Sequence, residues 1–192
     1  AEVNTNAPGK VKLEVIADAG SDVIIAAEIH TDGKLTKQFE IPDAKLWSVN
    51  TPNLYQLRVT FAAEQENGQN KCMETDQEEV IFGIRTLKWD KETGITINGE
   101  RVILRGACIH HDNGVLGACC YPDAEARKIR ILKENGYNAI RSAHNPCSKA
   151  LLEACDRQGM LVMDEFVDVW YIHKTEYDYV NYFKEWWLSL IH

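Results

Sequence analysis

Residues 138–163 read NAIRSAHNPCSKALLEACDRQGMLVM, and this stretch decides the fold of the second half of the chain. Ala139-Ile140 and the closing run Met160 to Met163 are short apolar segments that suit buried strands. Between them Ser148 can cap a helix that Gly159 can end, because serine favours helix starts and glycine favours helix ends. The stretch is therefore predicted to form a strand, a helix and a strand, with the two strands parallel.

The same pattern extends upstream toward the middle of the chain. Val102-Ile103-Leu104 is a compact apolar run, typical of a strand buried on both faces. A helix is predicted next, with Asp123 as its N-cap and Gly136 at its end. A further helix, rich in aromatic residues, is predicted over 177–190. The apolar residues of the first of these helices recur at helical spacing, at Ala126, Ile129 and Leu132. The resulting order of strands and helices demands a parallel sheet.

The residues up to Arg85 follow a period of two instead. Apolar and polar side chains alternate in three runs, at 11–15, 23–29 and 55–61. Turn residues separate these runs, at 18–21, 31–33 and 67–68. Six or seven short strands at this spacing are typical of an antiparallel sandwich, and Asn98-Gly99 predicts a further hairpin turn. We therefore predict a sandwich over 1–87 and a second domain over 88–192, with the boundary near Thr86 to Asp90.

Composition limits the function. The chain has 192 residues and a net charge of −8, which argues against a nucleic-acid partner because such binders carry a basic face. No apolar run approaches the ~20 residues that span a membrane. The stretch Ala1 to Lys10 has no apolar signal-peptide core, so periplasmic and cytoplasmic locations both stay open.

Cysteine usage favours thiols over disulfides. The six cysteines are Cys72, Cys108, Cys119, Cys120, Cys147 and Cys155. No two have CxxC spacing, the vicinal pair has poor disulfide geometry, and the apolar content is too high for a disulfide scaffold. We predict free thiols, several of them buried.

Polar and ionisable residues follow each of the three predicted parallel strands. They are His110-His111-Asp112 after the first, Arg141, His144 and Asn145 after the second, and Asp164, Glu165, Asp168 and Trp170 after the third. The carboxyl ends of parallel strands are where ligands bind. Carboxylates and histidines suit sugar hydroxyls, and a tryptophan suits the apolar face of a pyranose, so a carbohydrate site is predicted.

Simpler interpretations stay open for each group. His110-His111-Asp112 could hold a metal or make loop hydrogen bonds, although adjacent histidines at a strand end point apart. His144 could belong to a helix-entry turn, Asp164-Glu165 to a cap or an ion pair, and Trp170 to the core. Neither a metal nor a cofactor is predicted.

The stretch 138–163 resembles the signature of family 2 glycoside hydrolases, the β-galactosidase and β-glucuronidase family. Supporting pieces surround it, at 46–48, 52–55, 82–85, 98–100, 104–106, 110–112 and 164–165. One departure is Asn145, where many members have tyrosine. The resemblance implies an immunoglobulin-like sandwich followed by the first three βα units of a TIM barrel, with the family's amino-terminal jelly-roll domain missing.

The resemblance also implies a retaining β-glycosidase that uses two glutamates, after barrel strands four and seven. The acid/base glutamate follows an asparagine directly, and the chain has no Asn-Glu dipeptide. We therefore expect neither catalytic carboxylate in this chain and no turnover by it alone. By matching position, His144 would bind the sugar in the −1 subsite, Arg141 would support the catalytic carboxylates, and Glu165 would organise the site with Asp164 rather than act as the nucleophile.

Asp168 and Trp170 are the weaker candidates for substrate contact, and Asn145, His110 and His111 would support the site. A partial barrel leaves sheet edges open, so the barrel portion is expected either to be partly disordered or to self-associate. Two other classes of function remain: a non-catalytic carbohydrate-binding or interaction module, and a metal-dependent hydrolase.

Overall fold

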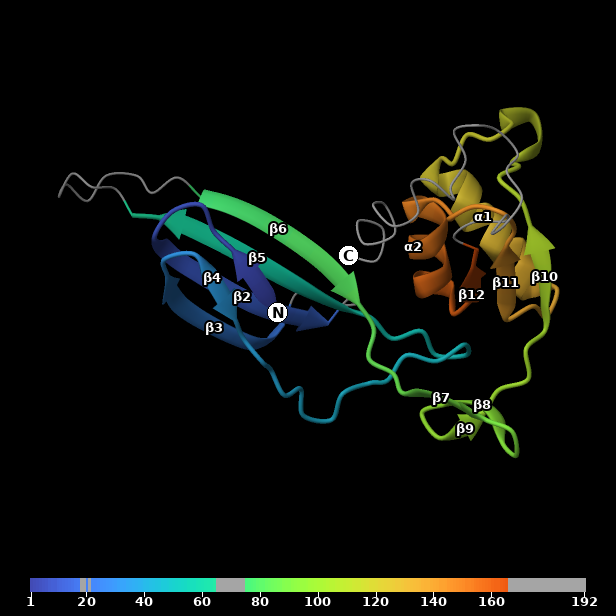
Figure 1. Cartoon of the computed structure of the whole chain (residues 1–192), viewed down its shortest axis with the longest axis horizontal. Helices are drawn as coiled ribbons and strands as arrows, with labels where there is room; N and C mark the ends of the chain where they lie inside the picture. Colours follow the sequence, from blue (N-terminus) through green and yellow to red (C-terminus); the bar gives the residue numbers. More distant parts are fainter. Residues whose placement is uncertain (18–19, 21, 65–74, 166–192) are drawn as a thin grey trace, which may run out of the picture. The chain divides into compact units, whose positions relative to one another are not determined.

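Figure 1 shows the computed structural model of the chain, which describes residues 1–17, 20, 22–64 and 75–165. The chain divides into two compact units, Ala1–Arg101 and Val102–His192. Each unit is built around its own sheets. The domain boundary between residues 87 and 88 remains a sequence-based prediction.

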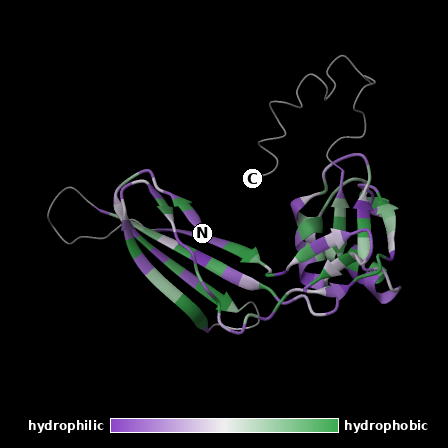
Figure 2. Cartoon of the chain, turned by 60° about the horizontal axis from the view of Figure 1, so that its bottom comes forward, coloured by the Kyte–Doolittle hydropathy of each residue, from purple (hydrophilic) through white to green (hydrophobic). Residues whose placement is uncertain are grey.

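The first unit is built on a four-stranded antiparallel sheet in the order β3-β2-β5-β6 (Figure 1). Its strands are β2 (Gly9–Ala17), β3 (Val23–Thr31), β5 (Tyr55–Ala63) and β6 (Thr75–Phe82). The predicted alternation is confirmed, because Val11, Leu13 and Val15 of β2 are buried while Lys10 and Lys12 are exposed. Figure 2 shows the same alternation as hydrophobic and hydrophilic bands along the strands.

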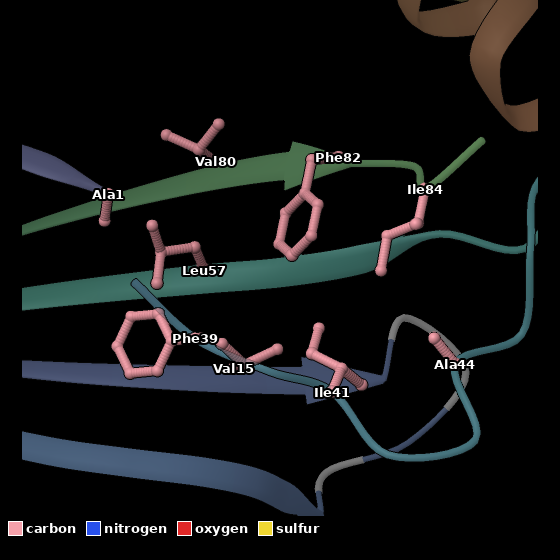
Figure 3. A pocket seen from close by; sticks show the side chains of 9 residues that line it. All are labelled: Ala1, Val15, Phe39, Ile41, Ala44, Leu57, Val80, Phe82 and Ile84. Carbon is pink, nitrogen blue, oxygen red and sulfur yellow. The ribbon is translucent and has the colours of Figure 1, made fainter. Parts of the chain in front are cut away.

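A second, shorter ladder pairs β1 (Glu2–Asn4) with β4 (Lys34–Thr36) in antiparallel register. Ala1, just before β1, lines a pocket together with Val15 of β2 and Leu57 of β5 (Figure 3), so this ladder lies over one face of the large sheet. Two antiparallel layers confirm the predicted sandwich.

The predicted hairpin turn at Asn98-Gly99 joins β8 (Gly94–Ile97) to β9 (Glu100–Arg101), and β8 also pairs with β7 (Leu87–Asp90). Asn98 and Gly99 both have positive φ, at 54° and 84°, as a type I′ turn requires. The Asn98 side chain donates to the carbonyl of Trp47 at 3.0 Å and accepts from the N–H of Thr86 at 3.0 Å. One amide thus fastens the turn to two distant segments.

The second unit confirms the predicted strand–helix–strand–helix–strand order. Its parallel sheet has the order β10 (Gly106–Ile109), β11 (Ala139–Ser142) and β12 (Leu161–Asp164). A 3₁₀ turn, η1 (Gly114–Leu116), precedes α1 (Pro122–Glu134), and α2 (Lys149–Gln158) links β11 to β12. The core between helices and sheet consists of Ile129, Ile140, Leu151, Ala154, Cys155 and Met160.

The prediction of a buried strand over Val102-Ile103-Leu104 is wrong. The strand begins at Gly106, and Ile103 and Leu104 are 64% and 42% exposed. The buried Asn138 side chain replaces ladder bonds here, because it donates to the Ile103 carbonyl at 2.9 Å and accepts from the Arg105 N–H at 2.8 Å. Pairing starts at Gly106, where a Cβ would lie 2.8 Å from the Ala139 carbonyl oxygen, so only glycine permits this approach.

The ends of the helices differ in how well the sequence predicts them. Ser148 caps α2 as predicted, because its hydroxyl accepts from the Leu151 N–H at 3.1 Å, and Gly159 ends that helix. Asp123 is not the N-cap of α1. Tyr121 holds that position and Pro122 is the first helical residue, since proline has no N–H to leave unpaired.

The described cysteines are all free thiols, as predicted. The expectation that several are buried is wrong, because Cys155 alone among them is buried. Burial raises the pKa of the Cys155 thiol to about 12. Cys72 and the helix predicted over 177–190 lie outside the described residues. Within the described residues, no helix has the length and apolar character needed to cross a membrane.

We expect the substitution Asn138→Ala to destabilise the second unit by about 1–3 kcal/mol, since it removes a buried side chain that bonds both the Arg105 N–H and the Ile103 carbonyl. Urea unfolding followed by circular dichroism at 222 nm measures this, because both described α-helices belong to that unit. Asn135→Ala is the matched control, as the Asn135 side chain is exposed and bonds only to the Ile131 carbonyl of its own helix. Equal midpoints for the two variants would contradict the bridging role.

Candidate functional site

The candidate site lies where β10, β11 and β12 end, and Glu165 is its centre. One oxygen of this carboxylate accepts from Arg141 Nε at 2.5 Å and also pairs with another guanidinium nitrogen of Arg141. The other oxygen accepts from the backbone N–H of His144 at 2.5 Å. Glu165 therefore fastens the end of β12 to both the end of β11 and the turn that follows it.

These contacts fix the charge of the pair. The His144 N–H, followed by the Arg141 guanidinium, lowers the pKa of Glu165 below its usual value, while Glu165 and then Cys108 raise the pKa of Arg141. Glu165 is thus held as a carboxylate and Arg141 as a cation. Such a charge-assisted pair positions its members by geometry as well as by charge.

His144 has a backbone conformation that is rare for its residue type. Its φ is 77°, in the left-handed region, which costs a non-glycine residue about 1–2 kcal/mol. The hydrogen bond from its N–H to Glu165 offsets part of that cost. Its ring lies 5.2 Å from the ring of His110, at an angle of 34°, so the ends of β10 and β11 meet through two imidazoles.

Arg141 has a second partner, Cys108, on the neighbouring strand. Cys108, Arg141 and Met163 stand opposite one another in the register of the parallel sheet. Arg141 Nη1 donates to Cys108 Sγ at 3.2 Å. This row points away from the helices, because the adjacent Ile140 is in the helix-facing core whereas Met163 is 61% exposed. Within the residues that the structure describes, the side of the sheet that carries Arg141 is thus exposed.

The two adjacent histidines make separate contacts. His111 Nε2 lies 3.1 Å from the carbonyl oxygen of Pro146, and because a carbonyl can only accept, that nitrogen carries the proton. His110 instead lies beside His144, with the two rings tilted relative to each other. Among the described residues, no group of three or more potential metal ligands comes together. This arrangement supports the loop hydrogen bond over a shared chelate.

Two hydrogen bonds hold the turn that follows β11 and contains His144. Asp164 Oδ1 accepts from the N–H of Cys147 at 3.0 Å, and the Ser142 hydroxyl donates to the carbonyl of Asn145 at 3.1 Å. Burial, together with the Asp164 charge, raises the pKa of the Cys147 thiol to about 12. Asp164 and Asn145 therefore shape the turn that presents His144.

A buried carboxylate that sequence reasoning missed holds the loop after β10. Glu125 is 1% exposed, accepts from the Asn113 side chain at 2.9 Å, and pairs with Lys128 at 3.0 Å. Burial by itself would raise the pKa of Glu125, but the hydrogen bonds from Asn113 and Lys128 outweigh it and the pKa falls. Asn113 also donates to the Cys119 carbonyl at 3.0 Å, so the loop is tied to α1. A glutamate in the first turn of a helix normally indicates a surface cap, which hides this role in the sequence.

The structure brings together most of the predicted site. Successive contacts join His110 to His144, His144 to Glu165 and Glu165 to Arg141. The adjoining turn contacts are made by His111, Asn145 and Asp164. The remaining two candidates, Asp168 and Trp170, lie outside the described residues.

Comparison with known proteins gives the same picture for both halves of the chain. Residues 1–85 match the family model of glycosyl hydrolases family 2, and residues 90–180 match that of the family's TIM barrel domain.

Among curated relatives, the chain is 40% identical over 170 residues to beta-galactosidase BoGH2A of Bacteroides ovatus, covering 88% of this chain and 18% of that protein. It is 34% identical over 179 residues to a putative beta-glucuronidase of Formosa agariphila, covering 93% of this chain and 16% of that protein. The chain thus spans less than a fifth of the length of these two relatives.

Solved structures agree with these matches. A beta-glycosidase from Bacteroides vulgatus superposes with a TM-score of 0.78 at 32% identity, covering 97% of this chain and 23% of that one. A glycosyl hydrolase family 2 member from Bacteroides cellulosilyticus superposes with a TM-score of 0.75 at 34% identity, covering 97% and 24%. The chain belongs to glycoside hydrolase family 2 and comprises an immunoglobulin-like domain followed by the start of the TIM-barrel domain.

Proposed function

We propose that this chain is part of a retaining β-glycosidase of the β-galactosidase type, which hydrolyses terminal β-glycosides, and that it supplies one side of the sugar-binding site. The observation that carries the proposal is the set of contacts joining Arg141, His144 and Glu165 at the carboxyl ends of the parallel strands. The names of the relatives, beta-galactosidase and beta-glucuronidase, support a β-glycoside as the substrate class.

In this proposal His144 binds the sugar. Its backbone is fixed by Glu165 and its ring by His110, so the imidazole is oriented before a ligand arrives. Such preorganisation allows a hydrogen bond to a sugar hydroxyl without a further loss of side-chain entropy. Asp168 and Trp170 are proposed as additional substrate contacts.

Arg141 supports the reacting carboxylates electrostatically. Its guanidinium has five donors, and Glu165 and Cys108 occupy only part of that capacity. A fixed cation beside the site favours ionised acids, which is the state that a nucleophilic carboxylate needs.

Glu165 organises the site and does not attack the sugar. Both of its oxygens already accept hydrogen bonds, from Arg141 and from His144, and its lowered pKa makes it a poor proton donor near neutral pH. A retaining mechanism needs two other carboxylates about 5–5.5 Å apart. We propose that both lie outside this chain, which contains no Asn-Glu dipeptide.

A non-catalytic carbohydrate-binding or interaction module is the second candidate. It is favoured by the assembly of His110, Arg141, His144 and Glu165 within this chain itself.

We also propose that the chain self-associates through the face bearing Cys108, Arg141 and Met163, which points away from the helices.

Within a longer protein that contains this chain and both catalytic glutamates, we expect His144→Ala to lower kcat/KM for an aryl β-galactoside by about 10²–10³-fold, the effect of losing a preorganised donor. Arg130→Ala is the control, because Arg130 pairs with Glu134 on the surface of α1. Steady-state kinetics on both variants measure this. Equal kcat/KM values for His144→Ala and the unsubstituted protein would contradict the proposal that His144 binds the sugar.

The purified 192-residue chain by itself is expected to show no turnover of an aryl β-galactoside, because the covalent and acid/base steps both lack their carboxylates. Release of the aryl group at increasing chain concentrations, after successive purification steps, measures this. Activity that increases with the concentration of the chain and survives purification would disprove the proposal that both catalytic carboxylates lie outside this chain. It would require a nucleophile within these residues.

The Glu165 contact is expected to fail only in acid. Because its pKa in the folded chain lies below 4.5, the contact is complete above that pH and is lost as the pH falls through the lowered pKa. The chemical shift of the His144 amide proton, followed by NMR from pH 7 downward, should change with a midpoint below 4.5. Glu165→Gln should abolish the transition, whereas a midpoint at or above 4.5 would show that the contacts with His144 and Arg141 do not lower the pKa of Glu165.

A further inference from the structure

Glu125, in the first turn of α1, is the one charged side chain that is buried among the residues the structure describes. Removing a carboxylate from water costs free energy, and an apolar side chain of similar size would fill the same space without that cost. The helix already packs on the core one turn later, through Ile129. The packing of α1 therefore does not require a carboxylate at this position, and its polar contacts must be what it provides.

The loop that follows β10 supplies the groups that this carboxylate binds. Asn113 Nδ2 lies 2.9 Å from Glu125 Oε1 and 3.0 Å from the carbonyl oxygen of Cys119, so one amide nitrogen donates to both. The Cys120 thiol is within hydrogen-bonding reach of the same carboxylate. Residues from the beginning and the end of the loop thus meet at one buried side chain, which closes the loop over residues 113–120.

A short, hydrogen-bonded turn separates Asn113 from the histidines of the candidate site. The Asp112 N–H donates to the His110 carbonyl at 2.8 Å, and the Asp112 side chain accepts from the Gly114 N–H at 2.8 Å. The ring of His110 in turn lies 5.2 Å from the ring of His144. Because the backbone between them is bonded to itself, a displacement of Asn113 also displaces His110.

We propose that Glu125, acting through Asn113, is a positioning residue of the site, because it closes the loop and so holds the His110 ring against His144. The importance of this position for sugar binding rests on the proposed function, whereas the ring contact itself does not. The position requires an acceptor oxygen that faces Asn113. Lys128 is not essential to this role, since its side chain is 18% exposed and can turn to water.

The first test follows the ring contact by NMR in the isotope-labelled chain, without a sugar. We expect the nuclear Overhauser effect between the His110 and His144 rings to be lost in Glu125→Met, which fills the space of the glutamate but offers no acceptor. Asn113→Ala should have the same effect, because it removes the donor and leaves α1 unaltered. Glu125→Gln keeps an acceptor oxygen and should retain the contact. Glu134→Met is the matched control, since Glu134 is exposed on the same helix.

The second test measures the kinetics of a longer protein that contains this chain and both catalytic glutamates. We expect Glu125→Met to lower kcat/KM for an aryl β-galactoside about tenfold, because a displaced binding group contacts the transition state less well. Added to His110→Ala, the same substitution should cause no further loss, since both changes act through one ring. A loop that was merely destabilised would lower kcat/KM by the same factor in both backgrounds.

Two results would overturn the proposal. One is retention of the ring contact in both Glu125→Met and Asn113→Ala, or its loss in Glu125→Gln as well. The other is an equal kinetic loss with and without the His110 side chain. Unchanged kinetics for His144→Ala, together with a ring contact that still depends on Glu125, would instead contradict the proposed sugar site and support the positioning role.

Discussion

The two oxygens of Glu165 bind groups that belong to a neighbouring strand and its turn, the Arg141 guanidinium and the His144 N–H. The placement of Arg141 and His144 at the carboxyl edge of the parallel sheet depends on this link. Without it, the left-handed backbone of His144 would lose a main compensation, and the imidazole would no longer be held against His110. Because the carboxylate carries a low pKa, the link is present throughout the neutral range. The sheet supplies the positions, and one ionised side chain sets the orientation of the others.

Much of the architecture could be predicted from the sequence because its signals are local and repeated. The alternation along β2 reflects burial of every second side chain, and Ser148 and Gly159 set the ends of α2 through their own backbone preferences. The site residues could be found because parallel strands present their carboxyl ends at one edge. This geometric rule placed Arg141, His144 and Glu165 together before any contact was known.

Two of the three misses arise from contacts between residues far apart in sequence. Val102 to Leu104 is as apolar as a buried strand, but the Asn138 side chain takes over its backbone bonds and the ladder starts later. Glu125 lies in the first turn of α1, where a glutamate usually caps the helix at the surface, but here it is buried and bound by Asn113 and Lys128. The third miss is local: Pro122 displaces the helix start from Asp123 because its ring already has the helical φ, and proline at the first helical position is itself a start signal. No short-range pattern encodes the other two features.

The left-handed backbone at His144 has a practical consequence for protein engineering. Residues that tolerate this conformation are few, chiefly glycine, asparagine and aspartate. A saturation library at this codon would therefore be filtered first for folding and only afterwards for sugar recognition. Diversity intended to alter substrate preference is better introduced at His110, whose ring contacts the same imidazole from a strand end with ordinary backbone geometry.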